Sequence, residues 1–276
     1  MFQTAIEELE ASGHFVSKPE SFRGYCNRTN QAIPRDVPNR ISVQTLSTLD
    51  GELRDSNVMV FRLGAPKGTR ATHFGLAKTV SSWADYFFLD DELFSSQETR
   101  AFIPSASVRD LYAFSLMPRF TETTLVNFAL ASGLLAEALG LEEAPSIPVT
   151  GRSTYTFDFC PRIKEDALWT HHAGQVEIDG VFTARRNGRD CLFIVEAKHG
   201  GLDSLAKTKL LYPYLALRPH VPKSMPISLI YLRATTSHNS INYSIAECLP
   251  TQDETLSPID LKIENASRFS VTHPSR

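Results

Sequence analysis

The sequence lacks the marks of several common protein classes. Its four cysteines include no C-x-x-C pair, which argues against a zinc ribbon. No apolar run approaches the roughly 20 residues that a membrane-spanning helix needs. The acidic residues 1–10 do not follow a signal-peptide pattern. We therefore expect a cytoplasmic protein that makes no membrane contact.

The sequence also lacks an excess of positive charge. It has 28 lysines and arginines against 31 aspartates and glutamates, a net charge of −3, so composition alone does not indicate nucleic-acid binding. A local basic groove remains compatible with that total. The cationic loop 64–70 follows an expected strand but lacks the spacing of a nucleotide-binding P-loop, and it is typical of a surface turn.

What the chain does contain is enough apolar material for a core. Hydrophobic residues make up 42% of its 276 residues, which suits one large domain or two smaller ones. Periodicity predicts helices and strands along most of its length. The expected helices are 1–12, 80–94, 108–117, 121–139 and 202–217, the last ending or kinking near Tyr212 because of Pro213. The expected strands are 58–63, 153–160, 175–180, 192–198, 226–232 and 243–248, and 21–40 is expected to be loop.

The order of these elements predicts an α/β (mixed α+β) fold with a central mixed sheet flanked by helices. The strand at 192–198 is apolar on both faces and should lie inside the sheet. A helical connection from it to 226–232 makes these two strands parallel. We divide the chain into an N-terminal α/β region (1–120), a core (121–250) and a peripheral polar tail (251–276).

Two expected strands carry the most informative side chains. In 175–180 alternation places Asp179 on one face, and in 192–198 it places Glu196 and Lys198 side by side. An Asn-Gly segment between them is typical of a hairpin turn. Folding the hairpin brings two carboxylates and one ammonium group together.

That cluster suggests a cation site. Two adjacent carboxylates repel each other, and a divalent cation removes the conflict. Mg²⁺ prefers oxygen ligands, here Asp179, Glu196 and the carbonyl of Ala197. A water held next to Lys198 could then attack a phosphodiester. The simpler alternative is that Lys198 forms a structural salt bridge across neighbouring strands.

This element order, with an acid on the second core strand and Glu-x-Lys ending the third, resembles the PD-(D/E)XK nuclease superfamily, and most closely a type II restriction endonuclease. The resemblance covers residues 121–250 and implies a restriction-endonuclease-like core. It makes Asp179, Glu196 and Lys198 the catalytic residues. The proline of the motif is replaced by Ile178.

The resemblance further implies a magnesium-dependent, site-specific endonuclease acting on double-stranded DNA. It implies a homodimer on a palindromic site and a cognate DNA methyltransferase as functional partner. Rival functions are a repair or junction-resolving nuclease of the same fold, an RNA-cutting relative, or a non-catalytic nucleic-acid-binding module.

Other residues are candidates for supporting roles. Glu177 and Glu137 are candidate additional acids, although a solvated helix glutamate is the simpler interpretation of Glu137. Three arginines of the hairpin turn, the histidine after Lys198 and two lysines of the following helix are candidate DNA contacts. A solvent-exposed surface position is the alternative for the arginines and for the histidine. They are Arg185, Arg186, Arg189, His199, Lys207 and Lys209.

Overall fold

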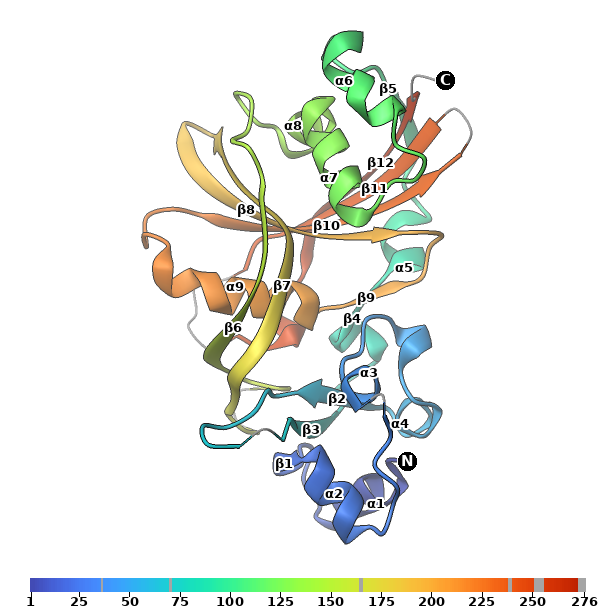
Figure 1. The fold of residues 1–276 in the computed structure, drawn as a ribbon, viewed down its shortest axis with the longest axis vertical. Helices are drawn as coiled ribbons and strands as arrows, with labels where there is room; N and C mark the ends of the chain where they lie inside the picture. Colours follow the sequence, from blue (N-terminus) through green and yellow to red (C-terminus); the bar gives the residue numbers. More distant parts are fainter. Residues whose placement is uncertain (36, 70, 164–165, 238–239, 251–255, 273–276) are drawn as a thin grey trace.

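The computed structural model describes residues 1–276 except 36, 70, 164–165, 238–239, 251–255 and 273–276. The molecule is elongated, with an N-terminal lobe (residues 1–78) at one end and a large sheet above it (Figure 1). Among the described residues, none of the helices combines the length and the hydrophobicity that spanning a bilayer requires.

The N-terminal lobe is a small three-stranded sheet covered by short helices. Its strands run in the order β1-β3-β2, all antiparallel. They are β1 (Glu20–Ser21), β2 (Val58–Arg62) and β3 (His73–Lys78). The helices are α1 (Gln3–Ala11), α2 (Phe22–Arg28), α3 (Val37–Ile41) and α4 (Gly51–Asp55), with a 3₁₀ turn at Leu46–Thr48.

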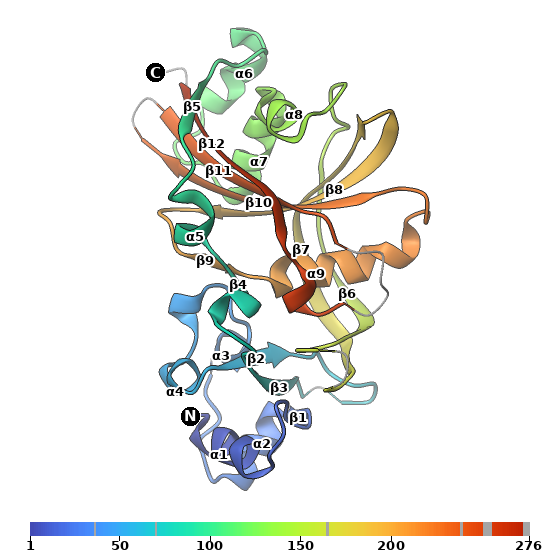
Figure 2. The ribbon, with the colours of Figure 1, turned by 180° about the vertical axis from the view of Figure 1, so that it is seen from behind.

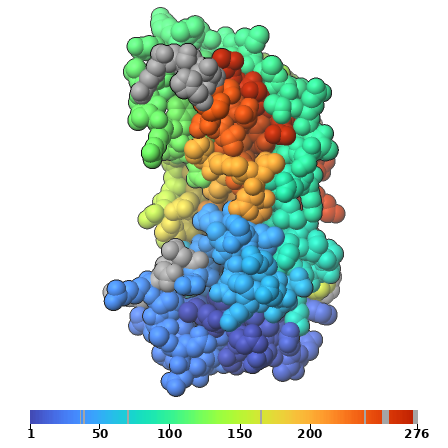
Figure 3. Space-filling view, turned by 90° about the vertical axis from the view of Figure 1, so that its right-hand side faces the viewer, coloured from blue at the N-terminus to red at the C-terminus, as the bar shows by residue number. Residues whose placement is uncertain are grey.

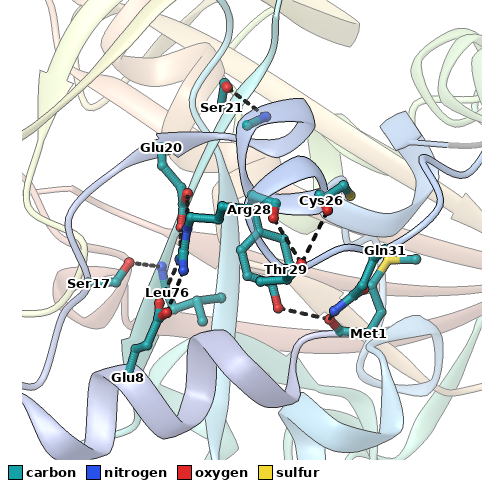
Figure 4. Close-up of polar contacts among 12 residues, drawn as sticks. Met1, Glu8, Ser17, Glu20, Ser21, Cys26, Arg28, Thr29, Gln31 and Leu76 are labelled. Carbon is teal, nitrogen blue, oxygen red and sulfur yellow. Dashed lines mark hydrogen bonds and ion pairs between the residues drawn. The ribbon is translucent and has the colours of Figure 1, made fainter.

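Polar contacts join the helices of this lobe. The guanidinium of Arg28, on α2, pairs with Glu8 of α1 and with Glu20 of β1 (Figure 4). Tyr25 Oη and Gln31 Nε2 both donate to the carbonyl of Met1, at 2.9 and 3.1 Å. The prediction that 21–40 is loop is wrong, because this segment contains α2 and most of α3. Ser21 caps α2, since its hydroxyl accepts the Gly24 amide.

The main sheet is a mixed sheet of seven strands in the order β5-β12-β11-β10-β8-β7-β6. The strands are β5 (Thr99–Phe102), β6 (Val149–Phe159), β7 (Trp169–Arg186), β8 (Arg189–His199), β10 (Ile227–Thr236), β11 (Ser240–Cys248) and β12 (Ile263–Thr272). As expected, β8 and β10 are parallel and β8 lies inside the sheet.

Helices cover both faces of this sheet (Figures 1 and 2). They are α5 (Asp90–Phe94), α6 (Val108–Ser115), α7 (Glu122–Ala131), α8 (Leu134–Leu139) and α9 (Thr208–Leu217), with 3₁₀ turns at Trp83–Asp85, Arg218–His220 and Pro258–Asp260. A two-stranded ribbon pairs β4 (Phe87–Leu89) with β9 (Ser204–Ala206).

Alternation along β8 divides the core in two. Phe193 and Val195 pack in a cluster with α7 and α8, whereas Leu192 and Ile194 pack in a second cluster that includes α9. The second cluster continues into the N-terminal lobe through residues such as Phe61. The lobe therefore shares a core with the α9 face of the sheet.

Several expected elements differ from the structure. Segment 80–94 is not one helix: Phe87 and Phe88 lie in β4, a strand that pairs with β9. The expected helix 121–139 breaks into α7 and α8 at Gly133, which has φ +84°. Segment 202–217 begins as β9, and α9 then runs through Pro213 to Leu217.

The tail is also more central than expected. Within it, β12 is inserted between β11 and β5, so residues 263–272 are part of the sheet and the expectation of a peripheral tail is wrong for them. Because β5 belongs to the expected N-terminal region, the sheet also crosses the boundary drawn at residue 120. Figure 3 shows the chain from about residue 85 to 105 running up one side of the molecule towards the C-terminal strands.

Candidate functional site

The predicted acid–lysine cluster forms where two neighbouring strands separate. Their hairpin is closed by Asn187 and Gly188, with φ +52° and +70°, the left-handed pair that a two-residue turn requires. Pairing of β7 with β8 extends from this turn to Gly180 and Val195 and then stops. Beyond that point a side chain replaces the backbone pairing: the Ala197 amide donates to Asp179 Oδ2 at 2.9 Å.

Glu196 and Lys198 lie beside Asp179. The carboxylate of Glu196 is almost fully buried, with 2% of the residue exposed. Lys198 Nζ lies 2.8 Å from Glu196 Oε1 and donates to the Ala197 carbonyl at 2.9 Å. The structure therefore brings the three predicted catalytic residues and the Ala197 carbonyl into one cluster.

Two helices complete the cluster from opposite faces of the sheet. Lys209, in the first turn of α9, places Nζ 3.4 Å from Glu196 Oε1. Glu122, in the first turn of α7, places Oε1 3.4 Å from Lys198 Nζ. The α7 terminus is set by Thr121, whose hydroxyl accepts the Thr124 amide.

The cluster has more negative than positive charge. It contains three carboxylates (Asp179, Glu196, Glu122) against two ammonium groups (Lys198, Lys209), a formal net charge of −1. Burial raises the pKa of Glu196, although Lys209 and Lys198 oppose that effect. Burial lowers the pKa of Lys198, but the surrounding carboxylates, chiefly Glu196, outweigh it and leave that pKa raised. The formal charges leave the cluster one positive charge short of neutrality.

The oxygen atoms suit a hard divalent cation. Glu196 Oε1 is buried and lies near two ammonium groups, but no hydrogen bond of good geometry reaches it. Together with Asp179 and the Ala197 carbonyl, this is the oxygen donor set that Mg²⁺ prefers. In the described part of the chain, no three His, Cys, Asp or Glu side chains group around one metal position. Lys198 Nζ itself sits among these oxygens and acts as an internal cation.

The two candidate additional acids are placed differently. Glu137 is exposed on α8, whereas the acid that reaches Lys198 from a helix is Glu122. Glu177 lies two residues before Asp179 on β7, is exposed, and pairs with Arg152 at 3.3 Å. Its carboxylate also accepts Gln175 Nε2 at 2.8 Å.

The three hairpin arginines lie far from the cluster. They flank the turn, six or more residues from Asp179, which corresponds to about 20 Å along a strand. Arg186 Nη1 pairs with the buried Glu247 at 2.5 Å, and Arg185 Nε lies 3.8 Å from Glu142. Arg189 is exposed.

The remaining candidate DNA contacts differ in whether they belong to the acid–lysine cluster. Of the two lysines, Lys209 joins the cluster, whereas Lys207 is buried with Nζ 5.3 Å from the centre of the Phe88 ring, and burial lowers its pKa to about 8. His199 is exposed, and its Nε2 lies 3.2 Å from Thr236 Oγ1 on β10.

Sequence reasoning missed Glu122 as a member of the cluster. Its position in the first turn of a capped helix was visible, but that position is also favoured by the helix dipole alone. Only the packing of α7 across β7 and β8 identifies its partner. That packing is close, since a Cβ at Gly180 would lie 3.1 Å from Val126 Cγ1.

Fold and site together define a mixed α/β protein with an acid–lysine cluster where strands β7 and β8 of its main sheet separate. A family model described as "Domain of unknown function (DUF6997)" matches residues 90–267, and the chain belongs to this family. The match contains the cluster and nearly all of the main sheet but not the N-terminal lobe. No curated protein and no solved structure matches the chain significantly.

Proposed function

We propose that this protein is a magnesium-dependent nuclease with a restriction-endonuclease-like core that hydrolyses phosphodiester bonds of duplex DNA. The observation that carries the proposal is the convergence of Asp179, Glu196 and Lys198 at the end of β7–β8 pairing, with the Ala197 carbonyl beside them. A merely structural salt bridge would need only Glu196 and Lys198. It would not need a second carboxylate, that of Asp179, which accepts the Ala197 amide.

Each residue has a defined part in the proposed mechanism. Asp179, Glu196 and the Ala197 carbonyl would hold the cation, which when bound would polarise the phosphoryl oxygens. Lys198 would leave the oxygens it occupies and turn towards the scissile phosphate. There its ammonium would orient the attacking water and stabilise the charge that develops on the phosphorus oxygens. Lys209 and the Asp179–Ala197 bond keep Glu196 and its strand in place.

The test is a digest of supercoiled plasmid DNA with Mg²⁺. Wild-type protein should cut it, Asp179→Asn and Glu196→Gln should abolish cutting, and Lys198→Ala should reduce the rate by roughly 10²–10³-fold. The matched control is Asp190→Asn, an exposed acid near the hairpin turn, which should cut like wild type. Discrete bands would indicate a sequence-specific enzyme, and a smear would indicate a repair-type or non-specific nuclease.

Calorimetry separates an enzyme from a DNA-binding module. Mg²⁺ should bind the wild-type protein and not Glu196→Gln, while both proteins should bind DNA. Cutting by a clean preparation of Asp179→Asn would contradict the proposed site. Equal Mg²⁺ binding by wild type and Glu196→Gln would do the same.

A further inference from the structure

A pocket lies between the N-terminal lobe and the main sheet, next to the proposed active site. It has a volume of about 80 Å³, enough for several water molecules and hence for a group of similar size to a phosphate. Polar groups line it from three elements: Ser42, Gln44 and Arg62 from the lobe, Gln175 and Glu177 from β7, and Thr208 and Lys209 from α9.

Arg62 is the unusual member of this lining. The residue is partly buried, and its Nε is inaccessible to solvent and has no hydrogen-bond partner among the described residues. No described carboxylate lies within ion-pair distance of it. Its backbone carbonyl, by contrast, accepts from His171 Nδ1 at 3.2 Å and from Tyr212 Oη at 3.3 Å. The backbone of Arg62 is therefore structural, while its side chain holds a positive charge near a pocket without a counter-ion.

The cost of such a charge indicates a missing partner. Removing the Arg62 Nε–H from water without an acceptor is unfavourable, and a bound anion would supply that acceptor. Lys209 adds a second cation on the opposite wall, and Ser42 and Thr208 add hydroxyl groups. The one acid of the lining, Glu177, is already paired with Arg152 at 3.3 Å and accepts from Gln175 Nε2 at 2.8 Å. The two cations and the hydroxyl groups are therefore suited to phosphate.

The pocket is within reach of a strand bound at the active site. Lys209 belongs to both, since it lines the pocket and pairs with Glu196. Along β7 the pocket wall at Gln175 and Glu177 precedes Asp179 by two to four residues, or roughly 7–13 Å. Successive nucleotides of one strand advance by about 3.4 Å along a duplex. A phosphate in the pocket would belong to a nucleotide a few positions from the cut.

We infer that this pocket binds a second phosphate of the substrate strand, with Arg62 as its principal ligand. The inference rests on the proposed function for the identity of the strand, but not for the chemistry of the pocket. The phosphate is either an internal backbone phosphate or a terminal 5′-phosphate. Binding it would place the N-terminal lobe in contact with DNA and align the strand over Asp179 and Glu196.

The first experiment measures duplex affinity against salt concentration in EDTA, where no cutting occurs. Loss of one phosphate contact reduces the slope of log K against log salt by about 1. We expect that reduction for Arg62→Gln. The control is Arg54→Gln, an exposed arginine of α4 outside the pocket, which should leave the slope unchanged. The slope is measured on duplexes that carry a 5′-phosphate and on duplexes that lack it. If Arg62→Gln reduces the slope on both, the pocket binds an internal phosphate. If it reduces the slope only on the 5′-phosphorylated duplex, the pocket binds the terminal phosphate.

The second experiment needs no DNA. Inorganic phosphate at millimolar concentration should raise the melting temperature of wild-type protein and of Arg54→Gln but not that of Arg62→Gln. Arg62→Gln should itself melt no lower than wild type, because it removes an uncompensated charge and no observed contact. A slope and a phosphate response unchanged in Arg62→Gln would overturn the inference even if the protein cuts DNA. A rise in melting temperature with phosphate that depends on Arg62 would support phosphate binding in the pocket, even if the protein does not cut DNA.

Discussion

At the scale of single residues, His171 shows how burial decides the state of an ionisable group. Its ring stacks on Phe157 with ring centres 4.8 Å apart, and only 1% of the residue is exposed. Burial is the main reason that its pKa falls to about 4, and the positive charges of Arg62 and His172 act in the same direction. The imidazole is therefore neutral in the folded protein at neutral pH.

We predict an acid-sensitive stability from this histidine. Between pH 6.5 and 4 the unfolded chain binds a proton that folded His171 does not, so stability falls as the pH is lowered through that window. The full effect is about 3 kcal/mol. At pH 7.5 the free energy of unfolding of His171→Phe should be about 1 kcal/mol below that of wild type, because the hydrogen bond to the Arg62 carbonyl is gone. Near pH 4.5 it should match or exceed that of wild type.

Urea unfolding at several pH values checks this prediction. The exposed His220→Asn serves as control and should follow the wild-type profile. The interpretation fails if His171→Phe loses stability on acidification as steeply as wild type does.

At the scale of elements, the β2–β3 loop docks the N-terminal lobe on β7. Ala65 donates its amide to the His172 carbonyl at 2.8 Å, and the His172 amide donates to Leu63 at 2.8 Å. Gly64 lies between these bonds with φ +69°, and a Cβ there would come within 2.1 Å of the His172 oxygen. Only glycine allows this approach.

Gly64→Ala should therefore destabilise the protein by roughly 2–3 kcal/mol, through both backbone strain and overlap with β7. Gly68→Ala is the matched control in the same loop, since its φ of +85° is similarly strained but no atom lies within 4 Å of the new Cβ. Thermal unfolding of the two variants isolates the contact with β7. Equal losses in both would show that the loop does not need this close approach.

Elements also show where sequence reasoning works. The hairpin, its two-residue turn and the parallel β8–β10 pair follow from local patterns: alternation, an Asn-Gly turn and a helical connection. Segment 80–94 shows the opposite. Its aromatic residues were expected to form a buried helix, yet Phe87 and Phe88 form a strand because β9, more than 100 residues later, supplies the partner.

At the scale of the whole molecule, a buried ion pair connects distant parts of the chain. Asp90 at the start of α5 is fully buried and pairs with Arg233 of β10 at 2.5 Å. The same carboxylate accepts Tyr231 Oη at 2.8 Å and the Asp203 amide at 2.8 Å. Arg233 in turn donates to the Ser204 carbonyl at 3.0 Å. Burial raises the pKa of Asp90, whereas Arg233 stabilises its ionised form.

Asp90→Asn should cost about 3–5 kcal/mol, because it leaves the Arg233 charge buried without its partner. The double variant Asp90→Leu with Arg233→Met should lose less than the single one, since both charges are removed together. Asp91→Asn, at an exposed neighbouring position, should leave the free energy of unfolding almost unchanged. Urea unfolding measures all three. A double variant less stable than Asp90→Asn would contradict this account of the pair.

Local patterns in the sequence are enough to assemble the centre of the acid–lysine cluster. Period-two alternation and a two-residue turn bring Asp179, Glu196 and Lys198 together through contacts that are local once the hairpin forms. Tertiary structure alone decided which helix residues join them, Glu122 and Lys209, since helix packing depends on side chains far apart in the chain. It likewise decided that the N-terminal lobe closes a pocket around Arg62, because that surface exists only after β2 meets β7 and α9.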